Sequence, residues 1–104
     1  MRILIIGAGG VGEAVAAIAS RRSYFDHMVI ADVDLARAAK VATDRKDTGR
    51  FSSTTVDASS QASVEAVIAA TNATVVLNAC DPRFNPGIFG ACLAAGVTDR
   101  KSVV

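Results

Sequence analysis

The feature that most constrains this chain is a glycine-rich turn between a short apolar run and a helical pattern. Residues 2–6 (RILII) are typical of a strand buried on both faces of a parallel sheet. Gly7, Gly9 and Gly12 then spell G-x-G-x-x-G, and apolar residues recur at helical spacing after them. This order of strand, turn and helix predicts the start of a βαβ unit, in which the helix packs closely on the strand.

The rest of the chain repeats the alternation of strand and helix. Further strands are expected at 28–31, 51–57 and 74–79, and further helices after the capping residues Asp34, Ser59 or Ser60, and Asn85. Such alternation implies parallel βαβ units with right-handed crossovers. We therefore predict an α/β fold: a partial Rossmann-type, doubly wound parallel sheet of four strands in the order 3-2-1-4 with flanking helices.

The helical spacing also predicts which side chains face the core. The inward faces are expected to be Val11, Ala14, Val15 and Ile18 in the first helix, and Ile88, Phe89, Cys92 and Leu93 in the last. The last helix has clear end signals, because Pro86 fits its first turn and Gly96 suits a left-handed residue after its end.

Composition excludes several classes of protein. The 104 residues are 51% hydrophobic with a formal net charge of +1, which allows one compact domain and excludes disorder. The near-neutral charge gives no electrostatic reason to bind nucleic acid or an anionic membrane. No run approaches the roughly 20 apolar residues that span a bilayer, and the first residues do not form a secretory signal. We expect a cytoplasmic protein with reduced cysteines.

The glycines have separate tasks in a dinucleotide site. Gly7 permits the tight turn, Gly9 lets the backbone approach a pyrophosphate, and Gly12 lets the helix pack close to the strand. The pyrophosphate would lie at the start of the helix, near Gly10 and Val11, where unpaired N–H groups favour an anion. A glycine-rich turn without any ligand is the alternative.

An acidic residue completes the motif. Asp32 ends the second strand, about 20 residues after the last glycine, and its carboxylate can accept hydrogen bonds from the adenosine ribose. A carboxylate there would repel a 2′-phosphate, which favours NAD over NADP. Arg37, in the following helix, is the counter-evidence because its guanidinium can turn toward a phosphate. NADP is therefore the alternative cofactor.

Two further loops should reach the same site. Asn78, Ala79 and Cys80 follow the fourth strand and should pass near the adenosine ribose, and Asp57 ends the third strand near the adenine edge. Ordinary turn chemistry is the alternative for both loops. No catalytic or metal-binding residue is assigned, since no histidine pattern accompanies Cys80, and His27, the only histidine, lies far from the glycine turn.

Four stretches of the chain resemble the amino-terminal domain of the saccharopine dehydrogenase family. They are RILIIGAGGVGEAVA, MVIADVD, VDASSQASVEAVI and VVLNACDPRFNPGIFGACLAAGVT. The resemblance covers about residues 2–98, and its most specific part runs from Asn78 to Phe89. It implies a nicotinamide-dependent oxidoreductase that acts on amino acids or their imine adducts, with a hydride passing between the nicotinamide and a carbon that bears an amine.

The resemblance also indicates what this chain lacks. It implies that Gly7, Gly9, Gly12, Asp32 and the turn 78–81 contact the cofactor. The family's substrate domain is absent, so the resemblance supplies no substrate-binding or acid–base residue. We expect the amino-acid substrate to bind only in a full-length parent, and this chain alone to be inactive. Two alternatives remain: a regulatory domain that senses NAD or ATP without catalysis, and a structural remnant that binds nothing.

The last six residues are DRKSVV, where related proteins continue with an apolar strand. One reading frame of a common short-read sequencing adapter encodes these residues followed by a stop. We expect residues 1–98 to be the amino-terminal part of a cofactor domain and residues 99–104 to be a non-native tail, with a genuine polar tail as the alternative. The far edge of the fourth strand would then be open, which favours self-association.

Overall fold

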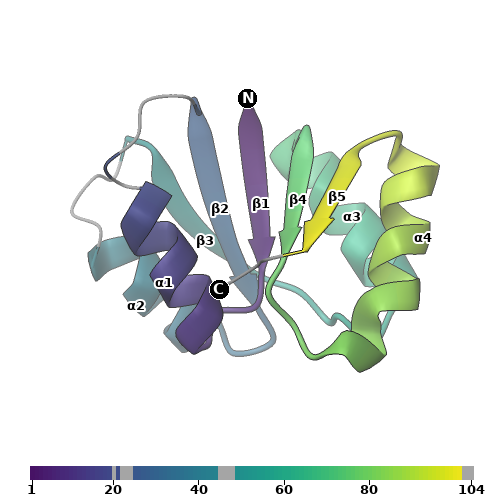
Figure 1. Cartoon of the computed structure of the whole chain (residues 1–104), viewed down its shortest axis with the longest axis horizontal. Helices are drawn as coiled ribbons and strands as arrows, with labels where there is room; N and C mark the ends of the chain where they lie inside the picture. Colours follow the sequence, from purple (N-terminus) through teal and green to yellow (C-terminus); the bar gives the residue numbers. More distant parts are fainter. Residues whose placement is uncertain (20, 22–24, 45–48, 102–104) are drawn as a thin grey trace.

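The chain folds into a parallel sheet flanked by helices (Figure 1). The computed structural model describes residues 1–19, 21, 25–44 and 49–101, without the side chains of Val11 and residues 98–101. The strands are β1 (Arg2–Ile6), β2 (His27–Asp32), β3 (Phe51–Thr55), β4 (Val75–Asn78) and β5 (Thr98–Lys101). The helices are α1 (Gly10–Ala19), α2 (Leu35–Asp44), α3 (Gln61–Thr71) and α4 (Asn85–Ala95), with a 3-10 turn η1 (Pro82–Phe84) before α4.

The strand order is β3-β2-β1-β4-β5, so the predicted α/β class and the order 3-2-1-4 are confirmed. From β1 the chain winds outward to β2 and β3, and then crosses back to place β4 on the other side of β1. The order therefore reverses between β1 and β4. In doubly wound sheets ligands bind at such a reversal, at the carboxyl ends of the strands. These ends lie at the lower edge of the sheet in Figure 1.

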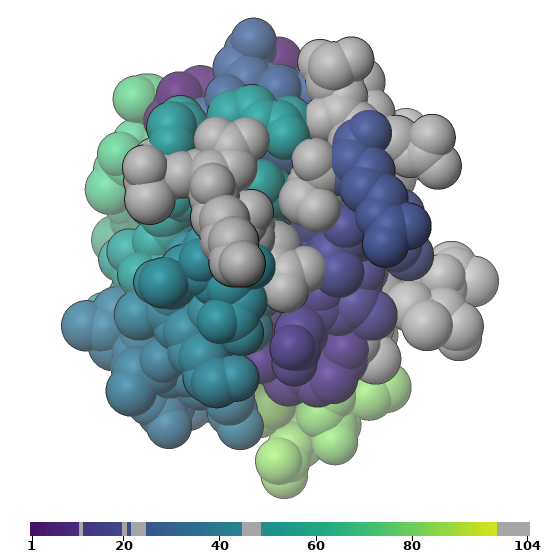
Figure 2. Space-filling view, turned by 90° about the vertical axis from the view of Figure 1, so that its left-hand side faces the viewer, coloured from purple at the N-terminus to yellow at the C-terminus, as the bar shows by residue number. Residues whose placement is uncertain are grey.

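β1 is the centre of the core. Ile3 and Ile5 pack into one apolar cluster with residues of α1 and α2, whereas Leu4 and Ile6 pack into a second cluster with residues of α3 and α4. Successive side chains of a strand point to opposite faces, so an unbroken apolar run is needed where both faces are covered. Figure 2 shows the side of the molecule on which α1 and α2 lie next to each other.

Most of the predicted helix ends are confirmed. The Asp34 side chain accepts a hydrogen bond from the Arg37 N–H at the start of α2, and the Ser60 hydroxyl accepts one from the Ser63 N–H at the start of α3. Gly96 closes α4 with a left-handed φ of 70°. None of the helices in the described part of the chain is long and apolar enough to cross a membrane.

The predicted inward faces are wrong in part. Ile88 and Cys92 are buried in α4, but Phe89 is 54% exposed and Leu93 is 66% exposed. Each of these two residues follows an inward residue and is turned by about 100° from it, and small Ala91 fills the inner face instead. In α1, Ile18 is exposed as well, because Gly12, Ala16 and Ala19 form the close contact with the sheet.

The prediction of an open β4 edge is also wrong. The backbone of residues 98–101 pairs with β4 in parallel register, from Val75 opposite Thr98 to Asn78 opposite Lys101. Pairing of this kind uses N–H and C=O groups, which every residue except proline carries, so it does not depend on an apolar sequence. The non-native origin of residues 99–104 stays a prediction, and residues 102–104 lie outside the described part of the chain.

Two neighbouring residues of α4 allow a matched test of this core. Replacing Ile88, which is fully buried, by Ala should lower the free energy of unfolding by about 2–5 kcal/mol, because a cavity is left between α4 and the sheet. Phe89→Ala should cost less than about 1 kcal/mol because that ring is half exposed. Urea unfolding measures both values, and equal losses would contradict the assigned orientation of α4.

Candidate functional site

A cavity of about 390 Å³ opens at the carboxyl ends of the strands. This volume lies within the range of roughly 300–1,000 Å³ that is usual for small-molecule sites. Eight residues that the sequence singles out line it: Gly7, Gly9, Asp32, Arg37, Asp57, Ala79, Cys80 and Asp81. They come from four separate segments of the chain, which the strand order brings to one edge of the sheet. Among the residues with described side chains, Gly10, Gly12 and Asn78 do not line it, and the side chain of Val11 lies outside the described part of the chain.

Gly7 forms the turn that leaves β1. Its φ is +108°, a left-handed value that disfavours any residue with a side chain. A Cβ atom at this position would lie 2.9 Å from the Ala79 carbonyl oxygen, so the loop after β4 packs directly on the turn. The Gly7 N–H donates to the Ala31 carbonyl at 2.7 Å. The turn is therefore fixed from both neighbouring strands.

The next two glycines of the motif differ in their surroundings. A Cβ atom on Gly12 would lie 1.9 Å from the Gly7 carbonyl oxygen, so α1 can approach the turn only because residue 12 lacks a side chain. Apart from chain neighbours, no atom of the described residues lies within 4 Å of the Cβ position of Gly9 or Gly10, so the backbone is open to a ligand there. The side chain of Val11 lies outside the described residues. The predicted task of Gly12 is thus confirmed.

The Asp32 carboxylate links the glycine turn to α2. It is 5% exposed and accepts hydrogen bonds from the Ala8 N–H at 2.7 Å, from the Asp34 N–H at 2.9 Å and from the Arg37 guanidinium at 2.9 Å. Burial alone raises the pKa of Asp32, but the hydrogen bonds outweigh burial, and the net pKa lies below its ordinary value. The carboxylate is therefore ionised at neutral pH, and its charge is compensated within the protein.

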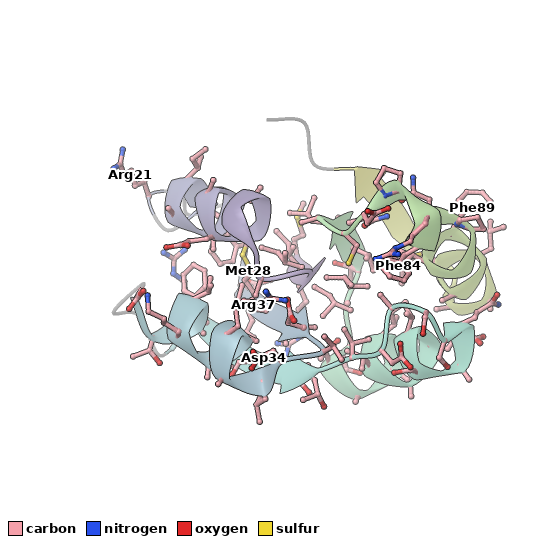
Figure 3. All side chains as sticks on the ribbon, turned by 90° about the horizontal axis from the view of Figure 1, so that it is seen from below. Arg21, Met28, Asp34, Arg37, Phe84 and Phe89 are labelled. Carbon is pink, nitrogen blue, oxygen red and sulfur yellow. The ribbon has the colours of Figure 1, made fainter. Side chains whose placement is uncertain are left out.

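Arg37 stands at the rim of the cavity. Its side chain is 53% exposed, and hydrogen bonding to Asp32 raises its pKa, so the guanidinium carries its charge at any physiological pH. Figure 3 looks onto the carboxyl edge of the sheet, with Arg37 on the α2 side and Phe84 across from it beside α4. Only part of the guanidinium is used by Asp32, because five N–H groups are available.

The walls of the cavity are largely apolar. Val33, Val56, Ala58 and Phe84 line it, and Val33 is 75% exposed although it is a large apolar side chain. Such a slot suits a flat ring system. These residues were not predicted from the sequence, although one signal was present: Val33 directly follows the acidic end of β2, where a solvated turn would carry a polar residue.

Asp57 lies at the cavity as predicted, but its carboxylate has local partners. It accepts hydrogen bonds from the Ser59 N–H and the Ser59 hydroxyl, and these bonds lower the pKa of Asp57 below its ordinary value. The Asp57 N–H in turn donates to the Ser63 hydroxyl at 3.0 Å. These bonds hold the loop between β3 and α3, and a contact with adenine stays a prediction.

Asn78 and Asn85 contact each other at the loop after β4. The Asn78 amide is 5% exposed and donates to the Asn85 side-chain oxygen at 2.8 Å. Asn85 was expected to cap α4 but is instead its first residue, without a capping bond, because Phe84 precedes the helix in helical conformation. The side chain of Asn85 thus serves this contact.

Cys80 has no features of a nucleophile. Its thiol approaches the Ile6 carbonyl oxygen at 3.3 Å, and burial, together with the charges of Asp32 and Asp81, raises the pKa of Cys80 to about 11. The thiol is therefore protonated at neutral pH, and the reactive thiolate is scarce. His27 begins β2 at the opposite edge of the sheet and contacts Ser52. Among the described residues, no three potential metal ligands gather.

Comparisons with known proteins identify a family and similar folds. Residues 3–98 match the family model described as the saccharopine dehydrogenase NADP binding domain. Apo saccharopine dehydrogenase (L-Glu forming) from Saccharomyces cerevisiae is similar in fold, with a TM-score of 0.82 and 17% identity over 99% of this chain and 22% of that chain. No curated protein matches the sequence.

A second group of similar structures consists of short-chain dehydrogenases/reductases. The one from Veillonella parvula DSM 2008, solved in complex with NADP, has a TM-score of 0.75 and 17% identity over 96% of this chain and 46% of that chain. At such identity the likeness shows the shared fold. The chain spans about a fifth to a half of the length of these structures.

Gly9 and Gly12 allow a matched pair of variants, because the Cβ position is open at Gly9 and blocked at Gly12. Gly12→Ala should lower the free energy of unfolding by at least about 2 kcal/mol, since its methyl group would overlap the Gly7 carbonyl. Gly9→Ala should stay within about 1 kcal/mol of the wild type because its Cβ position is open. Thermal or urea unfolding measures both changes. If Gly12→Ala leaves the free energy of unfolding unchanged, α1 does not approach the turn as described.

The Asp32 hydrogen bonds should make stability depend on pH. The folded-state pKa of Asp32 lies below the unfolded value of about 3.9, so its contribution is present above that value and is lost as pH falls toward the folded pKa. The wild type should therefore lose more unfolding free energy between about pH 5 and pH 2 than Asp32→Asn, whose amide does not titrate. Parallel pH profiles from denaturant unfolding would contradict this account.

Proposed function

This chain belongs to the family of saccharopine dehydrogenase NADP binding domains, and from this premise we propose that it is the cofactor-binding part of a larger amino-acid oxidoreductase. The family consists of NAD(P)-dependent oxidoreductases. The proposed substrates are amino acids or their imine adducts, and this class rests on the resemblance carried by the stretch from Asn78 to Phe89. The Saccharomyces cerevisiae enzyme is several times longer, so we place substrate binding in segments outside this chain.

The cavity fits the adenosine half of a dinucleotide. The open backbone at Gly9 and Gly10, at the start of α1, would hold the pyrophosphate, since the first N–H groups of a helix lack partners within it. The apolar walls at Val33 and Phe84 would hold the adenine ring. The nicotinamide supplies hydride chemistry when bound, and the described residues of this chain would only bind and orient the cofactor. We therefore expect binding without turnover by this chain alone.

The Asp32–Arg37 pair carries our proposal that NADP is preferred. Preference for NAD would require a carboxylate that repels the 2′-phosphate, but the Asp32 charge is compensated by two backbone N–H groups and the Arg37 guanidinium. Arg37 is half exposed at the rim of the cavity, where it can bind a second anion. In this arrangement Asp32 holds the guanidinium in place, and Arg37 binds the 2′-phosphate.

A titration with NADP, NAD and ADP-ribose tests both proposals. Arg37→Ala should weaken NADP binding about 10- to 100-fold and change NAD binding by less than about threefold, since the 2′-phosphate is the only part of the cofactor that we propose Arg37 to bind, and the Ala8 and Asp34 N–H groups still hold Asp32. Lys40→Ala is the matched control, because Lys40 is 75% exposed on the same helix and pairs with Asp44.

Three outcomes would count against these proposals. Equal losses for NADP and NAD in Arg37→Ala would contradict the preference for NADP. A folded chain that binds none of the three ligands would contradict the cofactor-binding function. Oxidation of amino acids by this chain alone would contradict the proposed division between this chain and a separate substrate-binding part.

A further inference from the structure

A buried pair of amides joins β4 to α4. Asn78 is the last residue of β4 and one of two polar residues in the described core, the other being Asp32. Its Nδ2 donates to the Asn85 Oδ1 at 2.8 Å, and its Oδ1 accepts from the Cys80 N–H at 3.0 Å. Both ends of the buried amide are therefore engaged within the protein, which leaves Asn78 poorly placed to contact a ligand.

The segment that this pair spans is one wall of the cavity. Ala79, Cys80, Asp81 and Phe84 all line the cavity, and all lie between Asn78 and Asn85. The loop is also fixed at its base, where the Ala79 N–H donates to the Ile6 carbonyl at 2.9 Å. The backbone of Ala79 and Cys80 lies directly against Gly7, and residues 79–81 and 84 line the cavity, so a small displacement of the loop would change the shape of the cavity.

We propose that Asn78 and Asn85 form a clamp that holds the loop 79–84 in position as a wall of the cofactor cavity. Asn78 is then a positioning residue, in place of the cofactor contact that the sequence suggests. The predicted effect of the clamp on cofactor affinity rests on the proposed function. The effect of the clamp on the loop itself does not depend on any cofactor. It includes how far the loop shields the half-buried Cys80 thiol from solvent.

The chemistry of the pair allows a sharp design. Asn78→Asp keeps the acceptor for the Cys80 N–H, and rotation of the Asn85 amide then supplies a donor to the new carboxylate. Asn85→Asp keeps the acceptor for the Asn78 amide. In the double variant two carboxyl groups would face each other across the present 2.8 Å contact. The measurements are made at a pH high enough to ionise both, where neither has a proton to donate and the two charges repel each other.

The first measurement is the rate at which a thiol reagent modifies Cys80, read by mass spectrometry so that buried Cys92 is counted separately. Each single Asp variant should react within about threefold of the wild-type rate, whereas Asn78→Ala and the double variant should react at least about tenfold faster because the loop opens. If circular dichroism shows that the double variant does not fold, Asn85→Ala is measured in its place, since this substitution removes only the acceptor of the clamp.

The second measurement is NADP affinity at a temperature where every variant is folded. The variants with fast Cys80 labelling should bind NADP about tenfold more weakly, and the single Asp variants should bind like the wild type. Unchanged labelling in Asn78→Ala, or a double variant that behaves like the singles, would overturn the clamp. If the wild type itself fails to bind NADP, the proposed function fails, while the labelling rates still decide on the clamp.

Discussion

The Asp32 carboxylate is the interaction on which the site depends. It is buried at the end of β2, and its oxygens accept from the N–H of Ala8 in the glycine turn and from the N–H of Asp34 before α2. One ionised group thus fixes the start of two segments relative to each other. A buried charge is tolerated only where such partners surround it, and here Arg37 completes the set from the cavity rim.

The order of the strands explains why these groups meet at all. β1 and β2 end beside each other, and β4 ends on the other side of β1, so the glycine turn lies between Asp32 and the loop after Asn78. The glycine turn carries only one side chain between residues 7 and 10, the buried methyl group of Ala8, so hydrogen bonds and packing from its neighbours must hold it in place. It is held by the Asp32 carboxylate on one side and by the backbone of Ala79 and Cys80 on the other.

Local patterns were sufficient to predict β1 to β4, the tight turn at Gly7 and the close packing at Gly12, because β1 and the glycine motif impose strict steric demands. They could not predict partners that depend on tertiary placement. Asp32 and Arg37 are visible in the sequence, but their pairing depends on where α2 starts. The outward turn of Phe89 was missed because α4 is apolar on several sides. The pairing of β5 was missed because backbone hydrogen bonds leave little trace in composition.

The central claim is that the glycine turn, Asp32 and Arg37 together form a dinucleotide site, and an NMR titration tests it most directly. On addition of NADP to the ¹⁵N-labelled chain, the amide signals of Ala8, Gly9 and Gly10 and the side-chain signal of Arg37 should shift together and saturate. Signals of His27 and Ser52, at the opposite edge of the sheet, should stay in place. Shifts confined to that opposite edge, or no saturable shift at the glycine turn, would contradict the account.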